Sequence, residues 1–536
     1  MSHRTATSVL CSDLTFEWPD GTPVLNGFHL AVPPGRTGLI GLNGAGKSTL
    51  LRLIAGELTP SAGTVRTSGE LGYLPQDAGT DTAHRVDEAL GIRAVREALH
   101  AIEAGDADER HFTTVGDDWD VEERARATLD RLGLHPDLDR TVGELSGGQA
   151  VLLRLAALLV RRPEVLLLDE PTNNLDRAAR ARLYEAVAGW QGTMVIVSHD
   201  RELLRRVDRI ADLRDGGVTW YGGNHDDYEA AVTAAQETAE RLVRNAEADV
   251  RRQQRDLVEA RTRLERSASY GKKRSVTRND PKIMAGRFKT QGEETAGRLK
   301  GMHAERLGEA RERLHAAEEA IRDDAEIRID LPHTAVPAGR TVLTLDRVRL
   351  AHGTRVQLEL RGPERIALVG ANGSGKSTLL RTVAGELAPL EGEIGRPVPL
   401  RHLPQRLDLL DDALSVVGNV RAFAPRADEN AVRARLARFL FRGARADQLA
   451  GGLSGGERFR ATLAALLLAE PPPQLLLLDE PTNNLDLASV RQLTQALSGY
   501  RGALVVASHD VPFLRGIGIT RWLELADGAV RRVDPL

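Results

Sequence analysis

Short apolar runs without alternating polar residues recur along this chain. Examples are Thr37–Ile40, Val165–Leu168 and Thr193–Val197, and Gly or Pro residues mark the turns between such runs. Runs of this length are typical of strands that are buried on both faces of a parallel sheet. The pattern therefore predicts α/β domains.

The middle of the chain has a different pattern. Glu229–Arg266 contains no Gly or Pro and has apolar residues at every seventh position, and Ala296–Arg322 has the same period. These heptads predict two coiled-coil helices, antiparallel to each other, the first roughly 55 Å long at about 1.5 Å per residue. A plain charged linker is the alternative, but heptads on both sides of a loop favour a hairpin. The heptad positions are Val243, Val250, Leu257, Leu264, Leu307, Leu314 and Ile321, and the loop contains Gly271, Pro281, Gly286 and Gly292.

An internal repeat sets the domain organisation. GLNGAGKST at 41–49 recurs as GANGSGKST at 370–378, an offset of 329 residues, and LSGGQ at 145–149 recurs as LSGGE at 453–457, an offset of 308. LLLDEPTNNLD and SHD recur at an offset of 310. The first copy therefore has 21 additional residues between Gln76 and Ser146. Self-similarity on this scale predicts two copies of one α/β domain.

The repeat and the heptads divide the chain into three parts. At 536 residues the chain is too long for a single hydrophobic core. We expect a first α/β domain at 1–228, a helical hairpin at 229–335 with a basic tip at about 266–300, and a second α/β domain at 336–536.

Composition excludes several classes of protein. The single cysteine, Cys11, excludes a disulfide framework, and the 14 histidines show no Cys/His spacing suited to zinc or an iron–sulfur cluster. Cys11 is expected to be a small strand residue. The N-terminus lacks a basic region followed by an apolar run, and the apolar runs are too short to span a bilayer. We therefore expect a cytoplasmic protein with no membrane domain of its own.

The net charge of −4 conceals a strongly basic segment. Between Arg266 and Lys300 there are ten Lys or Arg against three Asp or Glu, a net charge of +7, and five of the seven lysines in the chain lie here. Basic side chains gain affinity for RNA by releasing counterions, and aromatic side chains among them can stack on bases. A solvated surface is the alternative, but the concentration of charge favours a phosphate-bearing partner. The candidate RNA contacts are Lys272, Lys273, Arg274, Arg278, Lys282, Arg287, Phe288 and Lys289.

The remaining two lysines, Lys47 and Lys376, lie in GxxxxGK[ST] motifs. Such a loop between a strand and a helix wraps phosphates with backbone N–H groups, its lysine neutralises the β- and γ-phosphates, and its hydroxyl ligates magnesium. We therefore predict ATP and Mg²⁺ as ligands of both copies. The candidate phosphate-binding residues are Gly41, Asn43, Gly44, Gly46, Lys47, Ser48 and Thr49 in the first copy and Gly370, Asn372, Gly373, Gly375, Lys376, Ser377 and Thr378 in the second.

Paired carboxylates follow an apolar strand in each copy. Asp169 and Asp479 end these strands, where they can reach magnesium through water. Glu170 and Glu480 come next and are the natural groups to polarise an attacking water. A carboxylate at this position can also merely cap a helix, but its repetition within DEPTNNLD favours catalysis.

These motifs together resemble the ATP-binding-cassette superfamily. LSGGQ and LSGGE match the signature motif of that family, Gln76 and Gln405 match its Q-loops, and His199 and His509 match its switch histidines. The resemblance implies that Glu170, His199, Glu480 and His509 are catalytic and that Ser48, Gln76, Asp169, Ser377, Gln405 and Asp479 serve the metal. It also implies two cassettes facing head to tail within one monomer, each ATP lying between one phosphate loop and the opposite signature. The signature residues are Ser146, Gly147 and Gly148 for one site and Ser454, Gly455 and Gly456 for the other.

An aromatic residue ahead of the phosphate loop stacks on adenine in that family. Trp18 occupies the corresponding place in the first copy, and His352 in the second. A histidine stacks less well than a tryptophan, so the two sites are expected to differ in affinity. The alternative for Trp18 is a partly buried structural role.

Two cassettes joined by a charged helical hairpin resemble the ABC-F class of translation factors and ribosome-protection proteins. Residues 280–298, DPKIMAGRFKTQGEETAGR, look like the linker of antibiotic-resistance members from actinomycetes. The resemblance implies that the linker contacts the 23S rRNA and the P-site tRNA of the ribosome, and that antibiotics near the peptidyl-transferase centre are displaced. No DNA partner is expected.

Two other functions stay open at this stage. One is the ATPase subunit of a drug exporter that pairs with separate membrane proteins, although such a subunit has no use for a long basic hairpin. The other is a housekeeping ABC-F translation factor. Such factors often carry a sizeable arm in the first cassette, where this chain has only 21 additional residues, and 106–120 is acidic. A short arm favours resistance over a general translation role.

Overall fold

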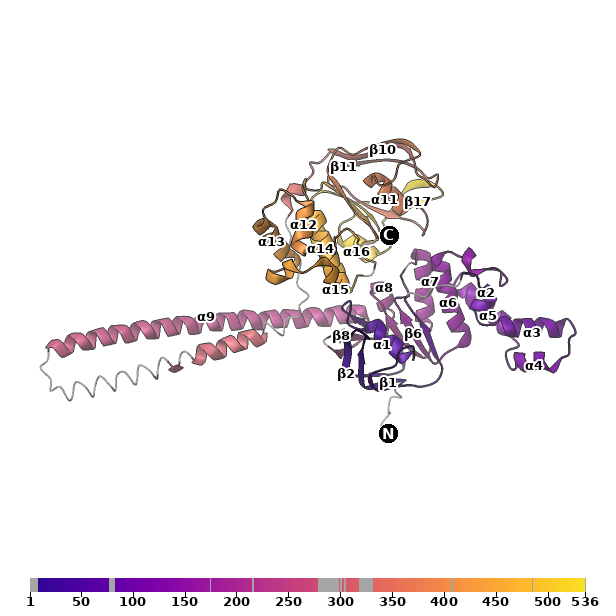
Figure 1. Ribbon diagram of the computed structural model, residues 1–536, viewed down its shortest axis with the longest axis horizontal. Coiled ribbons are helices and arrows are strands. Elements are labelled where there is room, and N and C mark those ends of the chain that lie inside the picture. Colours follow the sequence, from indigo (N-terminus) through magenta and orange to yellow (C-terminus); the bar gives the residue numbers. More distant parts are fainter. Residues whose placement is uncertain are drawn as a thin grey trace. The chain divides into compact units, whose positions relative to one another are not determined.

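The computed structural model describes residues 8–76, 82–173, 175–214, 216–277, 298, 301–302, 305–317, 331–405, 408–483 and 485–535. The chain divides into two compact units, one containing residues 1–226 and 326–536 and the other residues 227–325. The first of these units holds both copies of the internal repeat; the strands of the first copy form two sheets and those of the second copy form one (Figure 1).

The apolar runs of the first copy form the predicted parallel sheet, with the strand order β5-β6-β7-β3-β8-β9. Only β9 at its edge runs antiparallel to its neighbour. A separate antiparallel sheet has the order β2-β1-β4, and Cys11 is buried in β1 as the sequence predicts. The strands are β1 Val9–Glu17, β2 Pro23–Val32, β3 Gly35–Gly41, β4 Ala62–Thr67, β5 Leu71–Leu74, β6 Val165–Asp169, β7 Thr193–Val197, β8 Arg209–Arg214 and β9 Gly217–Gly222.

The helices of the first copy connect these strands. They are α1 Lys47–Ile54, α2 Val86–Ala89, α3 Arg93–Glu103, α4 Glu109–Val115, α5 Val121–Arg131, α6 Gly147–Arg161, α7 Arg177–Ala188 and α8 Arg201–Leu204, with a short 3₁₀ turn η1 at Val142–Glu144.

In the second copy one sheet has the order β13-β10-β11-β18-β17-β12-β16-β15-β14. Its parallel part, β17-β12-β16-β15-β14, corresponds to the parallel sheet of the first copy. The strands are β10 Thr341–Arg349, β11 Arg355–Arg361, β12 Arg365–Val369, β13 Glu391–Gly395, β14 Leu400–Leu403, β15 Leu475–Asp479, β16 Ala503–Ala507, β17 Arg521–Ala526 and β18 Ala529–Val533.

The helices of the second copy follow the same plan. They are α11 Lys376–Ala384, α12 Val416–Phe423, α13 Glu429–Leu436, α14 Gly455–Leu467, α15 Leu487–Ser498 and α16 Val511–Gly516. Short 3₁₀ turns lie at η2 Pro332–Thr334, η3 Ala437–Phe439, η4 Gly443–Asp447 and η5 Ala450–Gly452.

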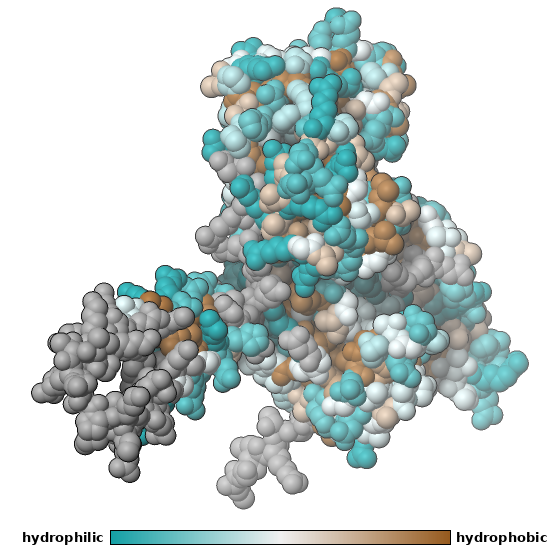
Figure 2. Space-filling model, turned by 60° about the vertical axis from the view of Figure 1, so that its left-hand side comes forward, coloured by the Kyte–Doolittle hydropathy of each residue, from teal (hydrophilic) through white to brown (hydrophobic). Residues whose placement is uncertain are grey.

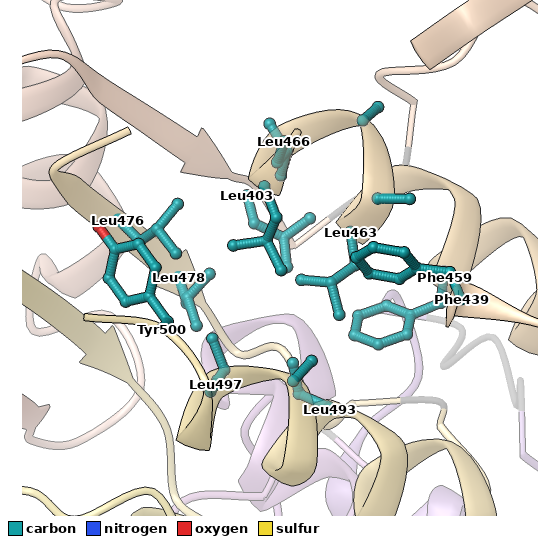
Figure 3. Packing of buried hydrophobic residues seen from close by; sticks show 14 of the residues in the cluster. Leu403, Phe439, Phe459, Leu463, Leu466, Leu476, Leu478, Leu493, Leu497 and Tyr500 are labelled. Atoms are coloured by element: carbon teal, nitrogen blue, oxygen red, sulfur yellow. The ribbon is translucent and has the colours of Figure 1, made fainter. Parts of the chain in front are cut away.

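The inner strand β15, between β16 and β14, shows why the strands have continuous apolar runs. Leu476 and Leu478 belong to the core on one face of the sheet, and Leu475 and Leu477 to the core on the other. Successive side chains of a strand point to opposite faces, so a strand covered on both faces must be apolar at every position. Figure 3 shows the first of these faces, where β15 packs against α14 and α15. Burial of each leucine contributes about 1.5–3 kcal/mol.

The 21 additional residues of the first copy fall in the segment that contains α2–α5, in which α3 and α4 pack against each other (Figure 1). Arg96 fixes the base of this segment, because its buried guanidinium lies 2.9 Å from Asp87, 2.8 Å from Asp139 and 3.2 Å from Glu122. The acidic stretch 106–120 contains α4, which packs against α3, so it is a folded element.

The second unit is built on α9, His225–Thr277, a helix of 53 residues. Residues 305–317 are also helical and lie beside it (Figure 1). Val250, Leu307 and Ala310 form a buried cluster against which Leu257 and Leu314 pack. Four of these five residues are positions of the predicted heptads. Residues 298, 301 and 302 of the second predicted helix are helical as well, and Ile321 lies outside the described residues.

The prediction for the start of the loop is wrong. The sequence pattern places Gly271 in the loop, but this residue lies within α9, which continues to Thr277. A glycine costs about 1 kcal/mol in a helix interior relative to alanine, and the basic residues that follow it are good helix formers, so the helix continues through it. Pro281, Gly286 and Gly292 lie outside the described residues.

The surface of the molecule is mixed in polarity. The face shown in Figure 2 is mainly hydrophilic, with scattered hydrophobic residues. Among the helices that the structure describes, none has the length and apolar content needed to cross a membrane.

Candidate nucleotide-binding site

The two phosphate loops connect β3 to α1 and β12 to α11, as the motifs predict. Gly41 and Gly370 have φ of 153° and 146°, and a Cβ at either position would meet a backbone carbonyl, Leu213 O at 2.4 Å or Leu525 O at 2.5 Å. Gly46 and Gly375 begin the helices in the left-handed conformation. Only glycine is compatible with these angles and approaches.

The loop lysines are held by their own loops. Lys47 Nζ donates to Gly41 O and Leu42 O, both at 2.9 Å, and Lys376 Nζ donates to Gly370 O at 2.7 Å and Ala371 O at 3.0 Å. Burial lowers the pKa of each ammonium, whereas Glu170 and Glu480 act in the opposite direction on their respective lysines. Each ammonium is therefore positioned at the N-terminus of its helix, where a phosphate is favoured.

In each copy, two of the three predicted magnesium residues, the serine and the aspartate, come together. Ser48 Oγ donates to Asp169 Oδ1 at 3.1 Å, and the Ser377 hydroxyl hydrogen-bonds to Asp479. Asp479 Oδ1 is buried with no hydrogen-bond partner among the described residues, and burial raises the pKa of its carboxyl group. A hydroxyl beside a carboxylate at the mouth of a phosphate loop fits Mg²⁺, which binds hard oxygen ligands and substrate phosphates. Gln76 and Gln405 follow β5 and β14 on exposed segments.

Glu170 and Glu480 have strained backbones. Their φ values are 47° and 45°, in the left-handed region that non-glycine residues seldom adopt, at a cost of about 1–3 kcal/mol each. The N–H of Glu170 donates to Val197 O, and that of Glu480 donates to Ala507 O, both at 2.8 Å. The neighbouring strand therefore fixes each glutamate at its turn, a feature that residue types alone do not reveal.

Each glutamate faces the predicted switch histidine of its own copy. His199 Nε2 lies 3.3 Å from Glu170 Oε1, and His509 Nε2 lies 3.4 Å from Glu480 Oε1. Burial raises the pKa of Glu170 to about 8 and that of Glu480 to about 7, and burial lowers the pKa of both histidines to about 3. Both imidazoles are therefore neutral at physiological pH, and each can donate one hydrogen bond and accept another.

The signature motifs begin helices. Ser146 caps α6 and Ser454 caps α14, and each forms a capping box with the side chain three residues later, Gln149 or Glu457. A Cβ added at Gly147 or Gly455 would meet nothing within 4 Å, so packing within the protein does not require glycine there. Glycines at an open helix N-terminus leave room for the close approach of an anion.

The last aspartate of each DEPTNNLD motif is not among the predicted site residues, yet it is part of the site. Asp486 caps α15 and also accepts a hydrogen bond from Asn43 N of the first phosphate loop, at 2.9 Å. Asp176 caps α7 in the same way and acts electrostatically on Lys376. Asp176 and Asp486 are repeated at an offset of 310 residues, and this repetition is the sequence signal that indicates a role for them in the site.

A cavity of about 300 Å³ lies at the second phosphate loop. Predicted residues of the second copy line it, and two residues of the first copy, Leu175 and Arg180, line it as well. The predicted residues in its wall are Asn372, Gly373, Gly375, Lys376, Ser377, Thr378, Gln405, Glu480 and His509, together with His352.

Trp18 lies directly after β1, where its half-buried ring stands edge-on to Phe16 with 5.1 Å between ring centroids. This contact fixes the ring against the first core. Of the predicted RNA contacts, Lys272, Lys273 and Arg274 lie on α9. Arg278, Lys282, Arg287, Phe288 and Lys289 lie outside the described residues.

Comparison with known proteins agrees with this fold and site. The ABC transporter family model matches residues 25–173 and 354–483. The chain is 37% identical to the tylosin resistance ATP-binding protein TlrC of Streptomyces fradiae, over 95% of this chain and 96% of TlrC. It is 31% identical to the energy-dependent translational throttle protein EttA of Escherichia coli, over 92% of this chain and 88% of EttA.

Solved structures agree at the level of fold. The RNase-L inhibitor matches with a TM-score of 0.57 and 19% identity over 98% of this chain and 90% of that one. The archaeal ribosome recycling factor aABCE1 matches with a TM-score of 0.56 and 20% identity over 96% and 87%. Fold and site thus define a protein with two phosphate-loop nucleotide-binding domains in tandem. The chain belongs to the ATP-binding-cassette family and, within it, to the ABC-F class.

Proposed function

We propose that this protein is an ATP-driven factor that binds the ribosome and displaces antibiotics bound near the peptidyl-transferase centre. The observation that carries the proposal is the second unit, in which α9 runs for 53 residues and bears lysines near its C-terminal end. A long helical element with basic residues suits contact with RNA.

The proposal begins with two composite ATP sites. The hydrogen bond from Asn43 N to Asp486 and the lining of one cavity by both copies support pairing of the cassettes within the chain. One site joins Lys47, Gln76, Glu170 and His199 with Ser454, Gly455 and Gly456, and the other joins Lys376, Gln405, Glu480 and His509 with Ser146, Gly147 and Gly148. ATP held in this way links the two cassettes.

Hydrolysis weakens that link. Glu170 and Glu480 are placed to orient the attacking water and, in their ionised forms, to deprotonate it, while the neutral His199 and His509 hydrogen-bond the reacting phosphate. Mg²⁺, when bound beside Ser48 and Ser377, neutralises charge that develops on the phosphates. Loss of the γ-phosphate removes the group that bridges the cassettes. Because both copies keep these residues, both sites are proposed to hydrolyse ATP.

The names of two relatives support the proposal that this ATPase cycle acts on the ribosome. TlrC is named for tylosin resistance and EttA for throttling translation, and both match this chain over more than nine-tenths of its length. We propose that the protein is cytoplasmic and that its second unit contacts the 23S rRNA and the P-site tRNA. Drug export with separate membrane subunits and a general translation role are the competing functions.

Co-sedimentation with ribosomes tests the proposal. The double variant Glu170→Gln/Glu480→Gln is expected to retain ATP and to pellet with 70S ribosomes when ATP is present. Lys47→Ala/Lys376→Ala, which loses the phosphate-binding ammoniums, is the matched control and is expected to stay in the supernatant. A double glutamine variant that binds ATP but never pellets with ribosomes rejects the ribosomal function, and its recruitment to membrane vesicles instead supports export.

A further inference from the structure

Arg180 belongs to the first copy but lines the cavity of the second ATP site. It lies on α7, four residues after Asp176 caps that helix, and it shares the cavity wall with Lys376, Glu480 and His509. An arginine whose charge faces a triphosphate site contributes to that site even though another domain supplies it.

The guanidinium of Arg180 is held in place from the side of the first copy. Its Nε donates to Leu175 O at 3.1 Å and one terminal nitrogen donates to Asp200 Oδ2 at 3.4 Å. Tyr184 OH donates to the same carboxylate oxygen at 2.6 Å. With its side chain only 14% exposed, Arg180 is a partly buried charge held by two hydrogen bonds.

The charge of Arg180 acts on the second site. Burial raises the pKa of Glu480, and Lys376 and then Arg180 oppose this effect. Burial lowers the pKa of His509, and Lys376 and then Arg180 lower it further. Arg180 therefore lies close enough to influence both predicted catalytic side chains.

The first site has no arginine at the position that corresponds to Arg180 in the internal repeat. At the offset of 310, Arg180 corresponds to Val490, which is 5% exposed and packs in the core of the second copy. His199 is influenced by Lys47 and Asp486, and His509 by their counterparts Lys376 and Asp176 and also by Arg180. The charges around the two histidines match except for this arginine.

We infer that Arg180 is a positioning residue of the second ATP site, supplied across the pair of cassettes, and that its charge outweighs the stacking advantage of Trp18 at the first site, so that the second site holds ATP more tightly. The inference rests on the composite sites of the proposed function. The physical reason is that a triphosphate carries several negative charges, and a fixed positive charge in a partly enclosed cavity attracts it more strongly than in water. As the ATP concentration rises, the second site fills first. The first site, for which Val490 is the counterpart of Arg180 in the repeat, fills second.

Titration of the Glu170→Gln/Glu480→Gln protein with a fluorescent ATP analogue tests this inference without ribosomes. Two classes of site are expected, and Lys376→Ala assigns the tighter class to the second copy. Arg180→Gln is expected to weaken the tighter class about tenfold and to leave the other class within about twofold. Arg180→Lys, which keeps the charge, restores most of the affinity.

Tyr184→Phe is the matched control, since it removes one contact to Asp200 but no charge, and neither class is expected to change. Arg180→Gln that leaves both classes unchanged, or weakens both equally, overturns the inference. Ser146→Arg introduces a bulky side chain at the signature motif that is proposed to complete the second site. It therefore tests the composite sites independently of the role of Arg180. If Ser146→Arg abolishes the tighter class while Arg180→Gln has no effect, only the role of Arg180 is rejected. If neither variant alters the tighter class, both proposals are rejected.

Discussion

At the scale of single residues, the predicted catalytic glutamates combine strain and burial. Both have positive φ, and both are fixed by a hydrogen bond from their own N–H to the adjacent strand. A carboxylate kept in this way does not reorganise when substrate arrives, which is what a positioned general base requires. The cost is carried by the fold in the absence of nucleotide.

The burial of the Glu170 carboxyl group predicts that the stability of the protein depends on pH. The pKa of Glu170 is raised by burial from 4.5 to about 8, so the fold favours its neutral form. Its contribution to stability is therefore complete below pH 4.5 and is lost as the pH rises through about 8. Between pH 5 and pH 8.5, nucleotide-free wild type is expected to lose on the order of 4 kcal/mol relative to Glu170→Gln.

Thermal unfolding of both proteins across this pH range measures the difference. Glu103→Gln is the control, because Glu103 is an exposed residue at the end of α3, and its unfolding temperature is expected to follow the wild type at every pH. Parallel curves for wild type and Glu170→Gln would show that Glu170 is ionised to the same extent in the folded and unfolded chains.

The sequence predicted residue types at the site better than their contacts. The repeated motifs indicated Lys47, Asp169 and Glu170 directly, because phosphate and water chemistry limits which side chains are suitable. Asp486 and Arg180 were not identified as site residues, because their relation to an ATP site depends on how two distant segments pack. A one-copy difference such as Arg180 against Val490 is visible in the sequence but has no meaning until both copies are placed.

At the scale of elements, the strands and the long helix follow from periodicity. Observed β6 and β7 lie within one residue of the predicted apolar runs, and the heptads of α9 supply Val250 and Leu257 to the helix pair. The end of α9 was less predictable, because glycine disfavours a helix by only about 1 kcal/mol. Helix ends depend on small differences of this kind, whereas continuous apolar patterns sum over many residues.

The helix pair makes a prediction of its own. Leu307 is 8% exposed and packs with Val250, so Leu307→Ala is expected to destabilise the second unit by about 2–4 kcal/mol. Backbone amides of α9 near Val250 should then exchange with deuterium faster, while ATP affinity stays unchanged. Leu242→Ala, at a position 54% exposed on the same helix, is the control. Equal exchange in both variants would mean that the two helices do not stabilise each other.

At the scale of the whole molecule, the folded chain forms two compact units, and both copies of the repeat belong to one of them. ATP that binds the paired copies favours one arrangement of the chain over another. The second unit can respond to this change, because its helix α9 begins directly after β9, the last strand of the first copy. In the proposed function the cassettes provide the switch and the basic helical unit provides the contact with the ribosome.

The central claim is that this switch protects ribosomes from an antibiotic, and cell-free translation tests it most directly because no membrane is present. Purified protein with ATP is expected to restore protein synthesis inhibited by a macrolide, a lincosamide or a streptogramin. Lys47→Ala/Lys376→Ala, and a deletion of residues 270–291 that keeps ATP binding, are expected to restore none. Continued inhibition at a molar excess of wild-type protein with each of these drugs, or equal rescue by the deletion variant, would contradict the account.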